Sequence, residues 1–135
     1  RLEDADYALV TIGSMTGAAK DAVDEARDRG EAVGLIKVKT FRPFPVAAMN
    51  RALGKVKAIG VVDRSVNFGW NCGPLYQETL AAAQQLRRYL PSASFIGGLA
   101  GADITVEHFG KVIENTARLL DGQHYDEPIW INRND

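Results

Sequence analysis

The chain has 135 residues, 46% of them hydrophobic, which is enough for one globular domain with a packed core. Its 16 basic and 17 acidic side chains leave a formal net charge of -1, so composition gives no electrostatic reason to expect nucleic-acid binding or binding to anionic membranes. A single cysteine excludes an internal disulfide, as well as a zinc or iron–sulfur site built from this chain's thiolates alone. We therefore expect a protein of a reducing compartment, the cytoplasm, with no metal site.

No apolar run approaches the roughly 20 residues that a membrane-spanning helix requires. The chain also opens at Arg1, with neither an initiator methionine nor a charged and apolar leader. We therefore expect no membrane segment, and we interpret residues 1–135 as a single domain that is a fragment or an excised part of a longer protein.

Apolar runs alternate with amphipathic stretches along the first half of the chain. Residues 7–12 predict a strand, and small apolar residues at helical spacing predict a helix over 19–28. A second strand is expected over 32–38. The prolines at 42–45 then end that strand, and a short helix is expected over 46–53.

The second half repeats the alternation around a long loop at 63–74. The expected elements are strands at 58–62 and 94–96, helices at 76–90 and 106–120, and a short additional strand at 128–131. The first of these helices is expected to end at Pro91, and the second near Gly122.

Four strand and helix pairs in so short a chain predict a three-layer α/β sandwich with a mainly parallel sheet and right-handed crossovers. In such a sheet the loops that follow the strands emerge at the same edge. The loops at 13–17, 41–45, 63–74 and 97–105 should therefore share one rim, where the unusual residues of this chain are concentrated.

One candidate anion site lies between the first strand and the first helix, where free backbone N–H groups and the helix dipole favour negative charge. Its residues are Gly13, Ser14, Met15, Thr16 and Gly17. The segment matches neither the dinucleotide-binding fingerprint nor the P-loop. Ser14 or Thr16 would serve equally well as the N-cap of the helix.

Charged residues on the same rim allow several roles. Arg42 can clamp a carboxylate or phosphate of a ligand, or bond a carbonyl or carboxylate of this chain or of a partner. Asp63 and Arg64 are adjacent on a strand and point to opposite faces, so they are not expected to pair. We expect Arg64 to pair with Asp103 across the rim, with capping of the last helix as an alternative role for Asp103.

No residue combination indicates catalysis by this chain alone. His108 and His124 lack neighbours at a metal or triad spacing, so we interpret them as surface histidines. Nothing near Cys72 in sequence would activate its thiol. The loop at 63–74 instead carries Phe68 and Trp70 among glycines and asparagines, a composition that favours a partner surface.

Three segments resemble the transketolase-C-like domain of the alpha subunit of thiamine-dependent 2-oxoacid:ferredoxin oxidoreductases, best known from pyruvate:ferredoxin oxidoreductase. They are LIKVKTFRPFP at 35–45, VDRSVNFG at 62–69 with GPL at 73–75, and GLAGADIT at 98–105. The likeness covers nearly the whole chain, and it implies that residues 1–135 are one domain that forms the C-terminal part of a larger subunit. The chain departs from the family pattern at Ala100 and Ala102, which stand where the third motif has glycine and arginine, and in a bulkier segment at 70–72.

The resemblance implies that the parent complex cleaves a 2-oxoacid on thiamine diphosphate with magnesium and forms an acyl-CoA. Electrons would pass through iron–sulfur clusters to ferredoxin or a similar acceptor. The resemblance also implies that this domain carries none of those cofactors and contains no catalytic residue. Its implied role is structural, at contacts with other domains and subunits. The residues expected at those contacts are Arg42, Asp63, Arg64, Phe68, Trp70, Asn71 and Asp103.

A plain interaction domain with no link to catalysis is one alternative that remains open on the sequence, and two more specific alternatives stand beside it. The first is the equivalent domain of another thiamine enzyme, either transketolase or the beta chain of a 2-oxoacid dehydrogenase. The second is a stand-alone phosphate- or nucleotide-binding module that uses the segment at 13–17.

Overall fold

A computed structural model describes residues 2–132 of the chain. Its sheet has five strands in the order β2-β1-β3-β4-β5, and all four strand pairings are parallel. The strands are β1 Tyr7–Ile12, β2 Val33–Val38, β3 Ala58–Asp63, β4 Ser92–Ile96 and β5 Ile129–Trp130. The predicted parallel sheet, including the short additional strand, is confirmed.

Four α-helices connect or follow the strands, as the sequence predicted. They are α1 Thr16–Asp28, α2 Val46–Leu53, α3 Pro74–Ala83 and α4 Val106–Arg118. Three 3-10 turns adjoin these helices, namely η1 Gly13–Met15, η2 Gln84–Leu86 and η4 Leu119–Asp121, and a fourth, η3 Leu99–Gly101, lies in the loop after β4. None of the helices in the described part of the chain is long and apolar enough to cross a membrane.

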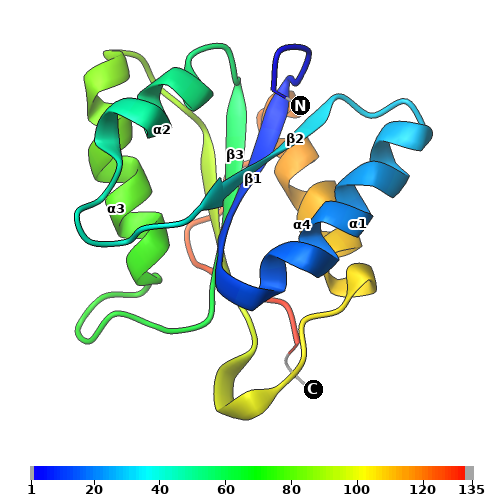
Figure 1. The fold of residues 1–135 in the computed structure, drawn as a ribbon, viewed down its shortest axis with the longest axis vertical. Helices are drawn as coiled ribbons and strands as arrows, with labels where there is room; N and C mark the ends of the chain where they lie inside the picture. The colour runs from blue at the N-terminus through cyan, green and yellow to red at the C-terminus, as the bar shows by residue number, and fades with distance from the viewer. Residues whose placement is uncertain (1, 133–135) are drawn as a thin grey trace.

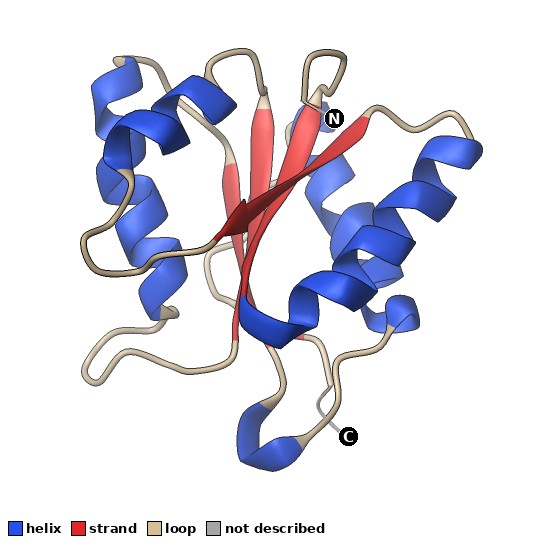
Figure 2. Cartoon of the chain, viewed as in Figure 1, coloured by secondary structure: helices blue, strands red, loops and turns tan. Residues whose placement is uncertain are grey.

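The helices cover the sheet in two layers, with α1 packed on α4 on one face and α2 packed on α3 on the other (Figure 1). Figure 2 shows the strands enclosed between these layers. The first face buries Leu9, Phe95 and Phe109, and the second buries Leu53 and Ile59. Burial of each such side chain contributes about 1.5–3 kcal/mol, so both helix layers are needed for stability.

The third strand lies at the centre of the sheet, and all six of its residues are buried. Such a strand reads as a continuous apolar run because both of its faces are covered. Gly60 in its middle lies directly under Thr116 of α4, and a β-carbon at this position would overlap the Thr116 hydroxyl. The absence of a side chain at Gly60 therefore sets how closely α4 approaches the sheet.

The predicted end of the third helix is wrong. The sequence pattern placed it at Leu90, but the α-helix ends at Ala83 and one 3-10 turn follows. Arg87 then adopts a left-handed backbone with φ 56°, and Arg88 donates to the carbonyl oxygens of Leu53 and Val56, each at 2.8 Å. These contacts to the connection between α2 and β3 replace the last helical turns, so β4 starts at residue 92 rather than 94.

The start of α4 is fixed by a capping box. The Thr105 hydroxyl accepts from His108 N at 3.3 Å, and His108 Nδ1 accepts from Thr105 N at 3.0 Å. His108 therefore has a structural role, and the alternative cap at Asp103 is not used.

Replacing Thr105 with alanine is expected to lower the free energy of unfolding by about 1 kcal/mol, because one helix N–H loses its acceptor. Urea denaturation of the variant measures this loss. Serine keeps the hydroxyl at this position, so Thr105→Ser is the matched control and should retain most of the stability. Equal losses in the two variants would contradict a role for the hydroxyl.

Candidate functional site

The strand order creates a crevice at the edge of the sheet where the strands end. The chain leaves β1 through α1 toward β2, and it leaves β3 through α3 toward β4, so the loops after β1 and β3 diverge. A cavity of about 350 Å³ lies between them. It is lined by Ile12, Gly13, Ser14, Met15, Phe41, Asp63, Arg64, Ser65, Pro74 and Leu75. Residues of three of the four predicted rim loops, 13–17, 41–45 and 63–74, therefore line this cavity. The fourth loop is joined to it by the contact between Arg64 and the Gly98 carbonyl.

Asp63 ends β3 and is only 2% exposed. Its carboxylate accepts hydrogen bonds from Leu75 N at 2.7 Å and from Tyr76 N at 3.0 Å, so it caps the first turn of α3. The N-cap residue itself, Gly73, has no side chain to do this, and a β-carbon there would overlap Asp63. The expected interface role of Asp63 does not fit this placement, because its carboxylate is turned inward to the helix.

Burial raises the pKa of Asp63 from 3.8 to about 6, against the opposing effect of the two backbone N–H donors. Burial also raises the pKa of the Cys72 thiol, and the nearby Asp63 charge adds to the rise. A thiol held protonated in this way is a poor nucleophile. The environment of Cys72 thus gives no support for a catalytic role.

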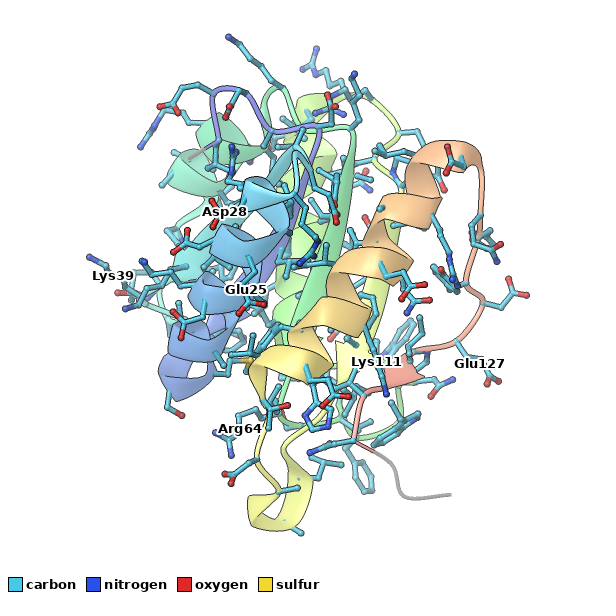
Figure 3. All side chains as sticks on the ribbon, turned by 90° about the vertical axis from the view of Figure 1, so that its right-hand side faces the viewer. Glu25, Asp28, Lys39, Arg64, Lys111 and Glu127 are labelled. Atoms are coloured by element: carbon cyan, nitrogen blue, oxygen red, sulfur yellow. The ribbon has the colours of Figure 1, made fainter. Side chains whose placement is uncertain are left out.

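Arg64 follows Asp63 and lines the cavity at the edge where the strands end, close to the start of α1 (Figure 3). Its guanidinium donates to Ser14 Oγ at 3.1 Å and reaches Gly98 O at 3.5 Å. The contact with Gly98 ties in the loop after β4. The predicted pairing of Arg64 with Asp103 is wrong, and Arg64 forms no salt bridge with any described residue.

Asp103 lies exposed in the loop after β4. Its backbone carbonyl accepts from the Asn132 side chain at 3.0 Å, and the same side chain accepts from Gly98 N at 3.1 Å. Asn132 thus closes the loop from Gly98 to Asp103. The role of Asn132 could not be predicted from the sequence, because no motif around it indicates a contact with this distant loop.

The segment at 13–17 forms η1 and the start of α1, and neither Ser14 nor Thr16 caps the helix. Ser14 accepts from Arg64, and the Thr16 hydroxyl lies 3.0 Å from that of Thr11. The capping interpretation is therefore wrong. A hollow of about 710 Å³ adjoins this segment between α1 and β2. Anion binding at this segment stays a prediction.

Arg42 lies on the rim beyond β2 and bonds within this chain. It donates to Glu78 Oε1 at 2.6 Å and to Phe41 O at 3.1 Å, and its guanidinium carbon lies 4.3 Å from the Phe41 ring centroid. This geometry matches the structural alternative stated for Arg42. The side chain remains 64% exposed, so its outer surface is open to a partner.

The loop at 64–73 carries two large exposed aromatic side chains. Phe68 is 106% exposed and Trp70 is 65% exposed, and Asn71 beside them is also exposed. The predicted exposure of the two aromatic residues is confirmed. What they contact in a larger assembly stays a prediction.

The donor side chains among the described residues bear on which cofactors this chain could hold. Among residues 2–132, no group of three or more His, Cys, Asp or Glu side chains lies close enough to hold a metal ion. An iron–sulfur cluster needs several thiolates and the chain has one cysteine. The one thiolate present therefore does not fit an iron–sulfur cluster, and we derive no reaction step on this chain.

Solved structures define the class of fold. The chain resembles an inactive beta4 tetramer of a split gene transketolase, with a TM-score of 0.66 and 13% identity over 87% of this chain and 40% of that chain. It also resembles the 2-oxoglutarate:ferredoxin oxidoreductase from Magnetococcus marinus, with a TM-score of 0.55 and 21% identity over 84% of this chain and 18% of that chain. The fold is therefore of the transketolase type, as the sequence predicted.

Residues 5–109 match the family described as Pyruvate:ferredoxin oxidoreductase core domain II. The chain belongs to this family. The resemblance seen in the three sequence segments is thereby confirmed.

Relatives of known role are subunits of oxidoreductases. The chain is 62% identical over 136 residues to the NADH-dependent phenylglyoxylate dehydrogenase subunit alpha of Aromatoleum evansii, covering 100% of this chain and 33% of that protein. It is 36% identical over 118 residues to the pyruvate synthase subunit PorA of Methanosarcina barkeri, covering 87% and 29%. The chain thus spans about a third of the length of the relatives it matches.

Proposed function

We propose that this chain is an organising domain in the alpha subunit of a thiamine diphosphate-dependent 2-oxoacid oxidoreductase. The observation that carries the proposal is the 62% identity to an alpha subunit across the whole chain. The parent enzyme would convert a 2-oxoacid and CoA to an acyl-CoA and CO2, with two electrons passed to an acceptor.

The same relative supports a specific substrate class and acceptor. It is the alpha subunit of an NADH-dependent phenylglyoxylate dehydrogenase. We therefore propose an aromatic 2-oxoacid as the substrate and NAD⁺ as the final acceptor, in place of the ferredoxin implied by the family resemblance. The balanced reaction is 2-oxoacid + CoA + NAD⁺ → acyl-CoA + CO2 + NADH.

The domain itself would contribute contacts rather than chemistry. Thiamine diphosphate, magnesium and iron–sulfur clusters would be held by other domains or subunits, which are its partners in the complex. The exposed rim supports this role, because an exposed Phe and Trp on one loop are typical of a protein interface. The proposed contact residues are Arg42, Arg64, Phe68, Trp70, Asn71 and Asp103. The single cysteine is consistent with the cytoplasm as location.

The test is a substrate panel on the intact parent complex. Phenylglyoxylate, pyruvate and 2-oxoglutarate are each supplied with CoA, and reduction of NAD⁺ and of a low-potential viologen dye is followed by absorbance. We expect the highest kcat/KM for phenylglyoxylate with NAD⁺. A preference for pyruvate would contradict the proposed substrate class, and no reduction with any 2-oxoacid would contradict the proposed function.

A further inference from the structure

The second strand leaves one edge of the sheet without a neighbouring strand. β2 pairs only with β1, and Figure 1 shows it at the front of the sheet, between α1 and α2, with no described segment in front of it. Tyr7 N donates to Ala32 O at 3.3 Å, so Ala32 turns its backbone groups toward β1. Because these groups alternate in direction along a strand, the N–H and C=O groups of Val33, Leu35 and Lys37 point away from the sheet. No hydrogen bond joins them to any described residue outside the sheet.

Both sides of this edge are open. The hollow of about 710 Å³ lies on the α1 side, a second hollow of about 410 Å³ lies on the α2 side, and Leu35 and Lys37 line both of them. Proteins usually protect such an edge with a proline, a bulge, a covering segment or charged side chains. The six residues of β2 pair with β1 without a bulge and contain no proline, which leaves Lys37 as the protective residue of the strand. The edge is therefore open to pairing with another strand.

We propose that β2 pairs antiparallel with β2 of a second copy of this chain, across a two-fold axis at Leu35, so that the two sheets become one continuous sheet. A contact of this kind uses the same surface on both copies, so it closes as a dimer and leaves no further edge at β2. The inference goes beyond the function proposed above and does not depend on it, because it concerns only the edge of this domain.

The side chains along the edge fit a second copy in this register. With the axis at Leu35, the half-buried Leu35 side chains of the two copies meet directly. Lys37 then lies opposite Val33 of the second copy, rather than opposite a like charge. Two residues further along, Lys39 lies opposite Glu31 of the second copy, so each end of the paired strands gains an opposite-charge pair.

The charged residues are available for these pairs. Lys37 and Lys39 are exposed, and neither forms a salt bridge with a described residue. Glu31 is half-buried and is held in place by the Tyr7 hydroxyl, which donates to its Oε2 at 2.7 Å. Its Oε1 lies 3.4 Å from the Arg29 guanidinium and has room for a second cation.

Neighbouring registers fit less well. An axis at Lys37 would place the two Lys37 side chains opposite each other, and like charges in that position are destabilising. An axis at residue 34 would bring Lys39 opposite Arg29, and an axis at residue 33 would bring Lys37 opposite Arg29. An axis at residue 36 would set Lys39 opposite Val33, without an acidic neighbour. Charge complementarity therefore selects the axis at Leu35.

The experiment replaces Leu35 with cysteine in the intact parent protein, which is oxidised with copper phenanthroline and run on a denaturing gel without reductant. Directly opposite residues in a hydrogen-bonded antiparallel pair have Cα atoms about 5.5 Å apart, which is within reach of a disulfide. Lys37→Cys is the matched control, because in the proposed register the two copies of residue 37 lie about 13 Å apart along the strands. Neither position is fully buried, so both variants keep the fold. The linked peptides are identified by mass spectrometry.

We expect Leu35→Cys to give a covalent dimer that joins residue 35 of both copies, with a yield at least several-fold above that of Lys37→Cys. Equal yields, a higher yield from Lys37→Cys, or no link between the two copies of residue 35 would each overturn the proposal. The readout is independent of activity. Failure of the link would therefore leave the proposed function standing, and a protein that links as expected but oxidises no 2-oxoacid would reject that function while retaining the dimer contact.

Charge variants test the register in the same assay. Lys39→Glu places two carboxylates opposite each other and is expected to lower the link yield from Leu35→Cys several-fold. Adding Glu31→Lys exchanges the two charges, so the combined variant should recover most of the yield. Lys111→Glu is the control, because Lys111 is exposed on α4, which packs on β3 and β4. Equal yields in Lys39→Glu and Lys111→Glu would overturn the pairing of Lys39 with Glu31.

Discussion

Replacing Gly73 with alanine is expected to lower the free energy of unfolding by about 3 kcal/mol, one of the largest effects of a single methyl group in this chain. The backbone of Gly73 has φ -87° and ψ 162°, which alanine adopts without strain. The cost is therefore steric, because the new β-carbon would overlap the Asp63 side chain. Displaced Asp63 would leave the N–H groups of Leu75 and Tyr76 without their acceptor.

Urea denaturation of the Gly73→Ala variant measures this effect. Gly110→Ala is the matched control, because Gly110 lies within α4 and a β-carbon there meets no other atom within 4 Å. That variant is expected to gain about 0.5–1 kcal/mol from the better helix propensity of alanine. A Gly73→Ala variant as stable as the wild type would show that the cap of α3 does not depend on the close approach of Asp63.

The second large effect is a dependence of stability on pH. The pKa of Asp63 is about 6 in the folded chain and 3.8 is its ordinary value, so the folded state binds the proton more tightly. The stabilisation from this tighter binding is fully present below pH 3.8 and is lost as the pH rises through about 6. The full change amounts to roughly 3 kcal/mol.

The measurement compares the wild type with Asp63→Asn, which cannot titrate at this position. Between about pH 4 and pH 7, the free energy of unfolding of the wild type should fall relative to that of the variant. If the difference between the two proteins stays constant or rises over this range, Asp63 does not have a raised pKa in the folded chain.

The fold could be predicted because its causes are local. Buried parallel strands are mostly apolar, as β1 and β3 are up to their last residues, and the helix periodicity of α4 follows from one covered face. The end of α3 could not be predicted in the same way. It depends on Arg88 reaching carbonyls more than thirty residues earlier in the chain, a contact that sequence spacing does not reveal.

The same distinction applies to the crevice. Sequence position sufficed to bring Gly13, Asp63 and Gly98 to one rim. The hydrogen-bond partners of these side chains could not be predicted from sequence position. Arg64 donates to Ser14, fifty residues earlier, and Asp63 accepts from Leu75 of α3, twelve residues later. One usable signal was missed. A helix that starts with Gly73 and Pro74 has no capping side chain of its own, so a buried acid at the end of the preceding strand is a natural candidate.

The capping box of α4 was also readable from the sequence. Thr105 stands three residues before His108 at the start of an apolar stripe. A histidine in this position departs from the usual capping box, which is closed by Glu or Gln. In this chain the imidazole Nδ1 acts as the acceptor for Thr105 N.

The most direct test of the account is the cofactor content of the complex that contains this chain, isolated through its full-length subunit. Thiamine diphosphate, iron and acid-labile sulfide would be quantified together with the ultraviolet and visible spectrum. The account predicts thiamine diphosphate and iron–sulfur absorbance in the complex, both retained when Cys72 is replaced by serine. A complex without thiamine diphosphate and iron–sulfur absorbance would contradict the assignment to a 2-oxoacid oxidoreductase.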